Sequence, residues 1–350
     1  MKKVHLLLAC LTICSNVFAQ KFFEIDLENI IYTPSANWSN VERDLVKDLL
    51  GDLEVEGQEQ IDSIDSGTYL QDSINTQGLT HSLTGMDHGS DFKYFLVGGS
   101  FSAGLNLNGK GIGDVLSGNV EGDDLKGFSA GGGAVFGFNL NPKTQIFLSG
   151  FKYEFQKDEF TLNFLNVGAK VRYQFIDGFG NALFRWNGLR LNTGIQFSEL
   201  KIGYDKSIDI KQSKSSAGID IEARLKTDIQ AQVSLNTLSI PLEASTSITV
   251  LSILTPYVGL GANLNFGSAN GDVKLTDTEV NVTKSGGSGS GTATTEASAN
   301  FGEKQKPGLV DPKMFLGLQL DLWKLKVGAQ YDKSLTTQSQ GVGFTVKLAI

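Results

Sequence analysis

The chain has 350 residues, of which 40% are hydrophobic and 19% charged, with 41 Gly and only 6 Pro. This composition fits neither a disordered nor a collagenous nor a multi-span helical protein. Both cysteines, Cys10 and Cys14, lie within the first 20 residues, so a mature chain that starts after them has no disulfide and no thiol chemistry. His81 and His88 are the only imidazoles after His5, which leaves little material for acid-base catalysis. We therefore do not expect an enzyme.

The first residues have the three zones of a secretory signal peptide. Lys2 and Lys3 precede an apolar run, and Val17-Phe18-Ala19 supplies the small residue before a cleavage site. We expect residues 1–19 to be removed by cleavage after Ala19. Lipoprotein processing at Cys10 is an alternative that leaves an apolar region of only a few residues. The run is too short to span a bilayer, and no later stretch reaches the roughly 18 uninterrupted apolar residues that a membrane helix needs.

Residues 20–91 form an acidic segment, with 15 Asp and Glu against three Lys and Arg. Ser39 and Glu42 have capping-box spacing, and apolar residues then recur at intervals of three and four, which predicts an amphipathic helix over about 40–56. The stretch from there to Asp91 is rich in Asp, Ser, Thr and Gly, so we expect a loop or a weakly ordered segment. We expect the whole segment to lie in the periplasm or to plug a lumen. Residues 92–350 are nearly neutral, which excludes a nucleic-acid footprint.

From Phe92 the apolar residues alternate with a period of two, as in β-strands. The clearest case is the segment from Ile219 to Leu235, in which one parity is apolar and the opposite parity is polar at eight consecutive positions. About twelve such segments occur, each near the ~9–11 residues that cross a bilayer at a tilt. The pattern stops over residues 267–310, where Gly, Ser, Thr and Ala dominate, and a flexible loop is expected.

The export signal, the lack of later cysteines, the abundant Gly and the alternating segments together resemble Gram-negative outer-membrane β-barrel proteins over residues 92–350. Leu238–Leu242 and Pro256–Gly261 are similar to strands of smaller barrels. The last strand alternates correctly but ends on Ile350, where the family usually ends on an aromatic residue. The resemblance implies an all-β fold: a single transmembrane antiparallel β-barrel of about 12 strands, within a range of 10 to 14, with a short helical N-terminal segment. It also implies outer-membrane lipid as surroundings and recognition of the C-terminal strand by the barrel-assembly machinery.

The physics of the bilayer agrees with this resemblance. A chain without apolar helices pairs all of its backbone groups within hydrocarbon only as a closed barrel. A soluble β-sandwich or another secreted β protein is an alternative, because its strands show the same alternation of apolar and polar residues. In a barrel the apolar parity faces lipid, and the polar and glycine parity faces the lumen. The charged residues predicted to line the lumen are Lys170, Arg172, Arg190, Asp220, Glu222, Arg224, Lys226 and Asp228.

Three short motifs resemble binding or catalytic sites but do not fit the pattern that such a site needs. Gly104–Lys110 has the spacing of a phosphate-binding loop, but Gly111 follows where Ser or Thr would hold magnesium. His81, Asp87, His88 and Asp91 fit no standard metal-ligand spacing, and His81 beside Ser82 is only a sequence neighbour. Glu121, Asp123 and Asp124 are better explained as an acidic surface turn than as a calcium site. We expect no catalytic, cofactor or metal site.

Two functions are consistent with these observations. The first is a passive channel or small-solute transporter, in which lumenal charges select the solute. The second is a non-conducting barrel that anchors surface loops for adhesion or for binding an extracellular partner. Lumenal charges also allow an internal salt-bridge network that closes a narrow lumen, so the sequence leaves the choice open.

Overall fold

The computed structural model describes residues 23–62, 66–84, 88–89, 91–107, 110–119, 124–157, 159–216, 219–286, 290–295 and 297–350. The expected signal peptide, its cleavage site after Ala19 and the lipoprotein candidate Cys10 lie outside these residues. The described helices are α2 (Asn40–Asp62), α3 (Ser66–Leu83) and α4 (Ile112–Leu116), together with the 3-10 turn η1 (Ser35–Asn37). In this part of the chain no helix has both the length and the apolar character needed to cross a membrane.

The strands are β1 (Phe23–Ile25), β2 (Ile31–Thr33), β3 (Phe95–Asn106), β4 (Gly127–Asn141), β5 (Thr144–Lys157), β6 (Phe160–Ile176), β7 (Phe179–Gly180), β8 (Phe184–Ser216), β9 (Ile219–Val250), β10 (Leu254–Gly286), β11 (Gly291–Thr295), β12 (Ala297–Gln305), β13 (Val310–Leu322), β14 (Leu325–Ser334) and β15 (Gln340–Ala349).

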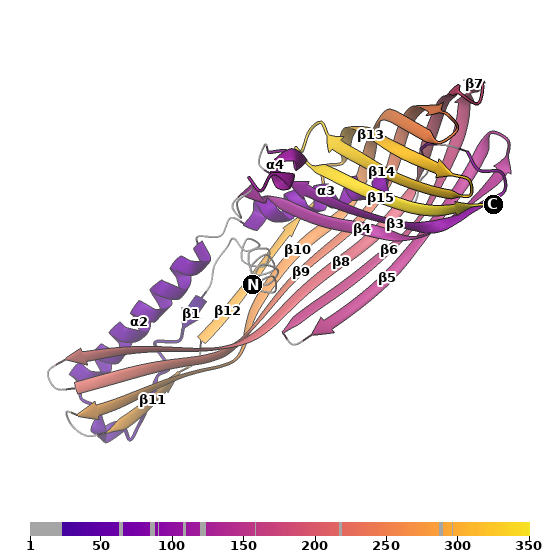
Figure 1. Cartoon of the computed structure of the whole chain (residues 1–350). Helices are drawn as coiled ribbons and strands as arrows, with labels where there is room; N and C mark the ends of the chain where they lie inside the picture. Colours follow the sequence, from indigo (N-terminus) through magenta and orange to yellow (C-terminus); the bar gives the residue numbers. More distant parts are fainter. Residues whose placement is uncertain are drawn as a thin grey trace.

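Ten of the described strands close into an antiparallel ring (Figure 1). Their hydrogen-bonded order is β3-β4-β5-β6-β8-β9-β10-β13-β14-β15, and β15 pairs with β3 to complete it. Closure leaves no sheet edge, so the backbone is satisfied without water. The predicted fold class, a single antiparallel β-barrel, is confirmed, and the strand number lies at the lower limit of the expected range.

The outward face of this ring is apolar. Phe101, Phe344 and Leu316 are 58%, 56% and 57% exposed, although a water-facing surface rarely carries so many large apolar side chains together. Ser102 and Lys313, on the inward faces of β3 and β13, are buried. This apolar outside and polar inside are typical of barrels in lipid, and the resemblance to outer-membrane β-barrel proteins is confirmed.

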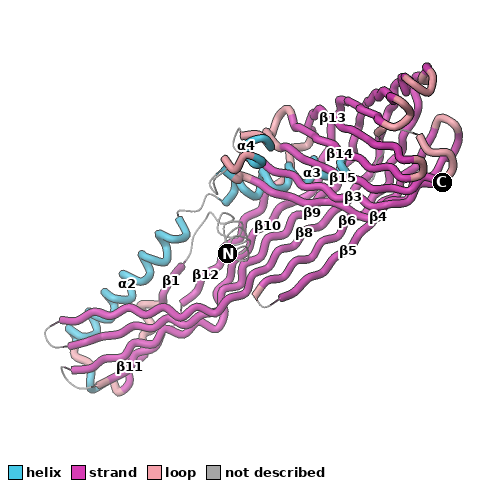
Figure 2. The backbone as a smooth tube through the Cα atoms, in the orientation of Figure 1, coloured by secondary structure: helices cyan, strands magenta, loops and turns pink. Residues whose placement is uncertain are grey.

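Three strands are far longer than a bilayer requires. β8, β9 and β10 have 33, 32 and 33 residues, against about 10 for a single crossing. Their ends extend beyond the pairing of β8 with β6 and of β10 with β13, and they leave the barrel as a long ribbon (Figure 2). We call this extension, together with β1, β2, β11, β12 and α2, the arm.

The arm corrects one expectation from the sequence. Most of the described residues in 267–310 are strand rather than loop: β10 continues to Gly286, and β11 and β12 pair with it. Val280 lies opposite Thr295 and Val282 opposite Ala293, and both valines are buried. The segment contains several Thr and Val residues, which fit a pleated strand when a partner strand is present. Its low complexity therefore concealed a hairpin.

The inner face changes character where the barrel meets the arm. One cross-strand layer is apolar and consists of Phe164, Leu200, Leu235 and Ala269; the next inward layer is small or polar and consists of Asn166, Ser198, Thr237 and Gly267. Toward the arm the inner face stays largely apolar, and toward the barrel it is polar. The apolar part forms the main core of the molecule, with Ile221, Val233 and Val282 among its members.

Helix α2 covers the apolar inner face of the arm. It begins with a capping box in which the Ser39 backbone N–H donates to Glu42 Oε2 (2.6 Å) and the Glu42 N–H donates to Ser39 Oγ (3.3 Å). Val46, Leu49 and Leu50 are buried in the core of the arm. The helix thus occupies the segment in which the sequence predicted one, but it lies on the arm rather than in the lumen.

Helix α3 corrects a second expectation, because the stretch after Gly57 was interpreted as loop. It spans Ser66–Leu83 and lies within the ring of strands (Figure 1). Amphipathic periodicity did not reveal it, since polar residues such as Gln77 and Thr80 are buried together with Leu79. A helix surrounded by polar walls needs no apolar stripe.

The buried ion pair between α2 and the arm gives a test of this packing. Lys284 Nζ lies 2.8 Å from Glu42 Oε1, and their side chains are 0% and 2% exposed. Because Lys284→Met leaves the carboxylate buried without this ammonium group, we expect α2 docking to weaken by about 3–5 kcal/mol. Denaturant unfolding in detergent, combined with limited proteolysis of α2, measures the loss.

Two controls accompany this variant. Adding Glu42→Gln to Lys284→Met removes the buried charge and should restore most of the stability. Lys214→Met disrupts only the solvent-exposed pairs with Asp48 and Asp52 and should have little effect. Equal losses for Lys284→Met and Lys214→Met would contradict the assignment of the buried pair.

Candidate functional site: the helix-filled lumen

The lumen of the barrel is occupied by α3. Its buried polar residues are Ser73, Asn75, Thr76, Gln77, Thr80, His81 and Ser82, and Thr84 directly after it is buried too. The N-terminal part of the helix belongs to the core of the arm through Tyr69, Leu70 and Ile74. The helix therefore changes from apolar to polar at the level where the surrounding strands do.

Glycines on β3, β4 and β15 let α3 lie directly on one side of the wall. A Cβ atom on Gly104 would be 2.5 Å from Thr76 Cγ2, and one on Gly127 would be 2.6 Å from the backbone of Asp72. A Cβ atom on Gly341 would be 2.8 Å from Leu83. The glycines at alternating, inward-facing positions of these strands thus form the surface that contacts α3.

The opposite wall holds α3 by hydrogen bonds. His81 bonds through Nδ1 to Ser239 Oγ (2.7 Å) and through Nε2 to Ser198 Oγ (2.5 Å). Asn263 Nδ2 donates to the Gly78 carbonyl at 2.9 Å. Thr237 Oγ1 donates to Gln77 Oε1 at 2.6 Å. Contacts from both sides fix the helix along most of its length.

Lys170, one of the residues predicted to line the lumen, caps the C-terminal end of α3. Its ammonium group donates to the carbonyls of His81 and Thr84, and to that of Ser82 at 3.3 Å. The last carbonyls of a helix have no intrahelical donors and carry the negative end of the helix dipole. A buried cation at this position satisfies both requirements.

Arg172 and Arg190, also predicted for the lumen, hold the segment that follows α3. Both guanidinium groups contact Asp91 Oδ1, at 2.9 and 3.1 Å. Arg190 also donates to the carbonyls of His88 (3.1 Å) and Gly89. Their side chains are 2% and 1% exposed. The structure thus brings three predicted residues together around one end of α3.

The other five predicted residues do not lie in the lumen, which corrects the sequence assignment. Asp220, Glu222, Arg224, Lys226 and Asp228 are on the part of β9 that belongs to the arm. Asp220, Glu222 and Lys226 are exposed, whereas the alternating residues Ile221 and Ala223 are 1% exposed. The two parities were distinguished correctly, but on the arm the apolar parity faces inward and the polar parity faces outward.

A second buried charge cluster escaped the sequence analysis. Lys313 Nζ lies 2.5 Å from Glu243 Oε1 and 3.3 Å from Asp332 Oδ2, and all three side chains are at most 1% exposed. Ser82 of α3 donates to Asp332 at 2.6 Å. The only signal in the sequence was a single charge on the inward parity of an otherwise uncharged strand segment, such as Glu243 between Leu238 and Val250.

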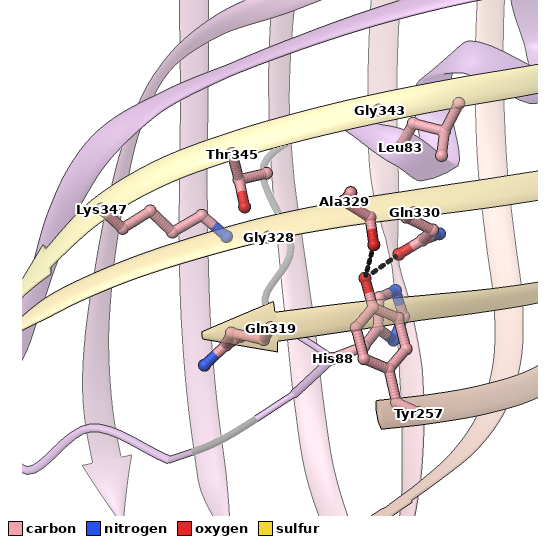
Figure 3. Close-up of a pocket in the computed structure, with 10 residues that line it drawn as sticks. All are labelled: Leu83, His88, Tyr257, Gln319, Gly328, Ala329, Gln330, Gly343, Thr345 and Lys347. Atoms are coloured by element: carbon pink, nitrogen blue, oxygen red, sulfur yellow. Dashed lines mark hydrogen bonds between the residues drawn. The ribbon is translucent and has the colours of Figure 1, made fainter. Parts of the chain in front are cut away.

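A small cavity lies beside His88 in the barrel (Figure 3). It is lined by Tyr257, Gln319 and Lys347, among others, and its volume is about 10 Å³. Tyr257 Oη donates to Gln330 Oε1 at 3.0 Å along its wall. This volume is near the minimum that holds one water molecule, so the cavity is too small for an organic solute.

The residues of the possible metal and phosphate motifs do not come together in one site, and those that the structure describes have other partners. His81 is engaged by two serines and Asp91 by two arginines, while Asp87, Glu121 and Asp123 lie outside the described residues. Gly104 belongs to β3, and Lys110 pairs with Asp124 at 2.6 Å. Within the described ranges, no group of three His, Cys, Asp or Glu is placed to hold a metal ion.

The glycine contact predicts a steric effect that depends on the face of the strand. Gly104→Val places new atoms against Thr76 and Thr80 of α3, and such overpacking costs about 1–3 kcal/mol or more. Gly99→Val is the matched control on the same strand, since its nearest neighbour is 3.8 Å from the added Cβ. Denaturant unfolding should separate the two variants. Equal stability would show that α3 does not rest on this wall.

The shared carboxylate predicts a second effect. Asp91→Asn deprives two buried guanidinium groups of their anion, and we expect a loss of about 2–3 kcal/mol. Asp177→Asn removes a carboxylate from the exposed pair with Lys143 and should leave stability unchanged. The temperature at which each protein loses its folded gel mobility provides the comparison. An unchanged midpoint for Asp91→Asn would contradict the stabilising role of the contacts between Asp91 and the two arginines.

Comparison with known proteins adds a family to this description. Among solved structures, the chain is similar to the translocator domain of the autotransporter NalP from Neisseria meningitidis (11% identity, TM-score 0.28, covering 79% of this chain and 93% of that one). It is also similar to CarO from Acinetobacter baumannii (13% identity, TM-score 0.27, 72% and 97%). These likenesses concern the fold alone. No curated protein matches the chain. The family model described as Lsa36-like matches residues 49–349, most of the chain, and the chain belongs to this family.

Proposed function

We propose that the chain is a non-conducting outer-membrane barrel that anchors a surface-exposed β extension for binding an extracellular partner. The observation that carries this proposal is the occupied lumen. α3 rests on glycines on one side, hydrogen-bonds to the opposite wall and is held at its C-terminal end by Lys170. A solute would have to displace a helix that the wall contacts on several sides.

The ends of the barrel support an outward direction for the arm. At one end the connections are short, as at residues 142–143, 251–253 and 323–324. At the other end lie the longest connections, including the one with α4 and the one with β11 and β12. Bacterial outer-membrane barrels have short periplasmic turns and longer extracellular loops. The arm, at the long-loop end, then projects from the cell.

The arm has the properties of a displayed surface. Its inner face is closed by α2, and its outer face carries alternating charges such as Glu222 and Lys226. Lys214 lies 2.9 Å from Asp48 and 3.1 Å from Asp52 on α2, and these carboxylates raise the pKa of its ammonium group above the ordinary value. A strand-built platform presents side chains in fixed positions, which a flexible loop does not.

The same proposal includes lipid and the barrel-assembly machinery as partners. The outward residues of the last strand, including Phe344, Val346 and Leu348, are exposed and apolar and fit a lipid-facing C-terminal strand. We assign no catalysis. Ser198 and Ser239, the serines on His81, are 1% and 0% exposed, so a lipid or peptide substrate has no room to approach them.

One observation favours a channel as the second candidate. Gln77 Nε2, Asn263 Oδ1 and Asn265 Nδ2 are buried between α3 and the wall without a protein partner. Buried polar atoms of this kind are usually satisfied by water. A hydrated contact between helix and wall is compatible with movement of α3, and such a movement would open a path for small solutes.

Conductance measurements on a variant in which a reducible disulfide joins α3 to the barrel wall distinguish the two candidates. Thr76 Oγ1 of α3 and Ser339 Oγ of the wall are 3.1 Å apart, so Thr76→Cys with Ser339→Cys is placed to form a disulfide between helix and wall. We expect the full chain, in planar bilayers, to give no ohmic steps with the disulfide formed or reduced. Heat-dependent gel mobility confirms that the inserted protein is folded.

Two outcomes would overturn the proposal. Ohmic steps that stop when the disulfide forms would establish a channel gated by α3. Steps that persist in the locked protein would establish a path beside the helix. The lumenal residues Lys170, Arg172 and Arg190 would then be the first positions to substitute for effects on ion selectivity.

A further inference from the structure

The residues before α3 and the strand after it lie at opposite ends of the barrel. On the arm, Phe23 of β1 pairs with Ala299 of β12, and Ile31 of β2 pairs with Thr294 of β11. At the other end, the backbone N–H of Phe95, the first residue of β3, donates to the Ile350 carbonyl at 3.0 Å. The chain therefore passes from one end of the barrel to the other between these two points.

Helix α3 makes this passage. It has 18 residues, which at 1.5 Å per residue span about 27 Å from the arm into the lumen of the barrel. Its N-terminal residues Leu70 and Ile74 belong to the core of the arm, and its C-terminal end is held by Lys170. The chain thus passes through the inside of the ring along α3 and the segment after it, rather than through lipid.

The arm is complete only when the N-terminal segment is in place. Without α2 the inner face that includes Ile221 and Val233 would be exposed to water. Lys284, whose side chain is 0% exposed, would lose the carboxylate of Glu42 at 2.8 Å. The apolar inner face and its buried cation therefore require α2 on the same side of the membrane as the arm.

We infer that residues 23–62 cross the outer membrane through the lumen of their own barrel and stay on the cell surface as part of the arm, with α3 left in the lumen behind them. The segment is acidic and contains no apolar stretch long enough to pass through lipid, whereas the lumen is polar. This inference rests on the proposed outward direction of the arm.

Cysteine labelling on intact cells tests the inference. Cys10 and Cys14 are the only cysteines of the chain, so changing both to Ser gives a background without thiols. Single substitutions then place a thiol before α3 (Glu28→Cys), on the outer face of the arm (Ser213→Cys) and in a short turn (Lys324→Cys). All three positions are exposed in the structure. The probe is a maleimide that does not cross membranes.

We expect Glu28→Cys to be labelled on intact cells to the same extent as Ser213→Cys. Labelling of Lys324→Cys should appear only after the outer membrane is permeabilised. If Ser213→Cys is labelled but Glu28→Cys is protected until permeabilisation, the N-terminal segment has not crossed, and the inference is wrong while the proposed direction of the arm stands. If Ser213→Cys itself is protected and Lys324→Cys is labelled, the proposed direction fails first.

Discussion

The outward face of the long strands meets hydrocarbon over one part of their length and water over the rest, and this change of environment determines the rest of the structure. Successive side chains alternate between the two faces without interruption. An outside in lipid requires a polar inside, and an outside in water requires an apolar inside. On β9 the inward residues change from Val233 and Leu235 to Thr237 and Ser239. Phe164 and Asn166 on β6 show the same change at the same level.

Each of the two inner faces needs its own filling, and consecutive helices supply both. α2 is amphipathic and buries Val46, Leu49 and Leu50 against the arm. α3 buries Gln77, Thr80 and His81 in the polar lumen. A single apolar helix could not satisfy the lumen, because the inward Asn, Ser and Lys side chains of the wall would remain without partners. α2, the first of the two helices in the chain, covers the inner face of the arm, and α3, the second, fills the lumen of the barrel.

Period-two alternation was enough to predict the strands, because it depends on backbone geometry alone, whereas the barrel also needed the export signal and the family resemblance. The assignment of faces needed more, since parity does not say which side is wet. Asp220 and Lys170 both lie on polar parities, yet Asp220 is exposed on the arm and Lys170 is 2% exposed in the lumen. Neighbouring residues do not distinguish the two cases, because Ala169 and Val171 flank Lys170 just as Ile221 and Ala223 flank Glu222. Helix α3 gave no signal in the sequence, because hydrophobic periodicity detects helices only where one side is apolar.

The wall cations add a charged contact at the C-terminal end of α3 to the contacts along its length. Lys313 has Glu243 and Asp332 beside it within the wall, so that charge cluster does not depend on the helix for compensation. The Lys170 ammonium group instead donates to carbonyls at the end of α3 and to that of Thr84 just after it, and both arginines share Asp91. Burial of cations with few partners is costly, so the C-terminal end of α3 and its following segment stabilise this part of the wall. Folding of the barrel and placement of the helix are therefore coupled through charge.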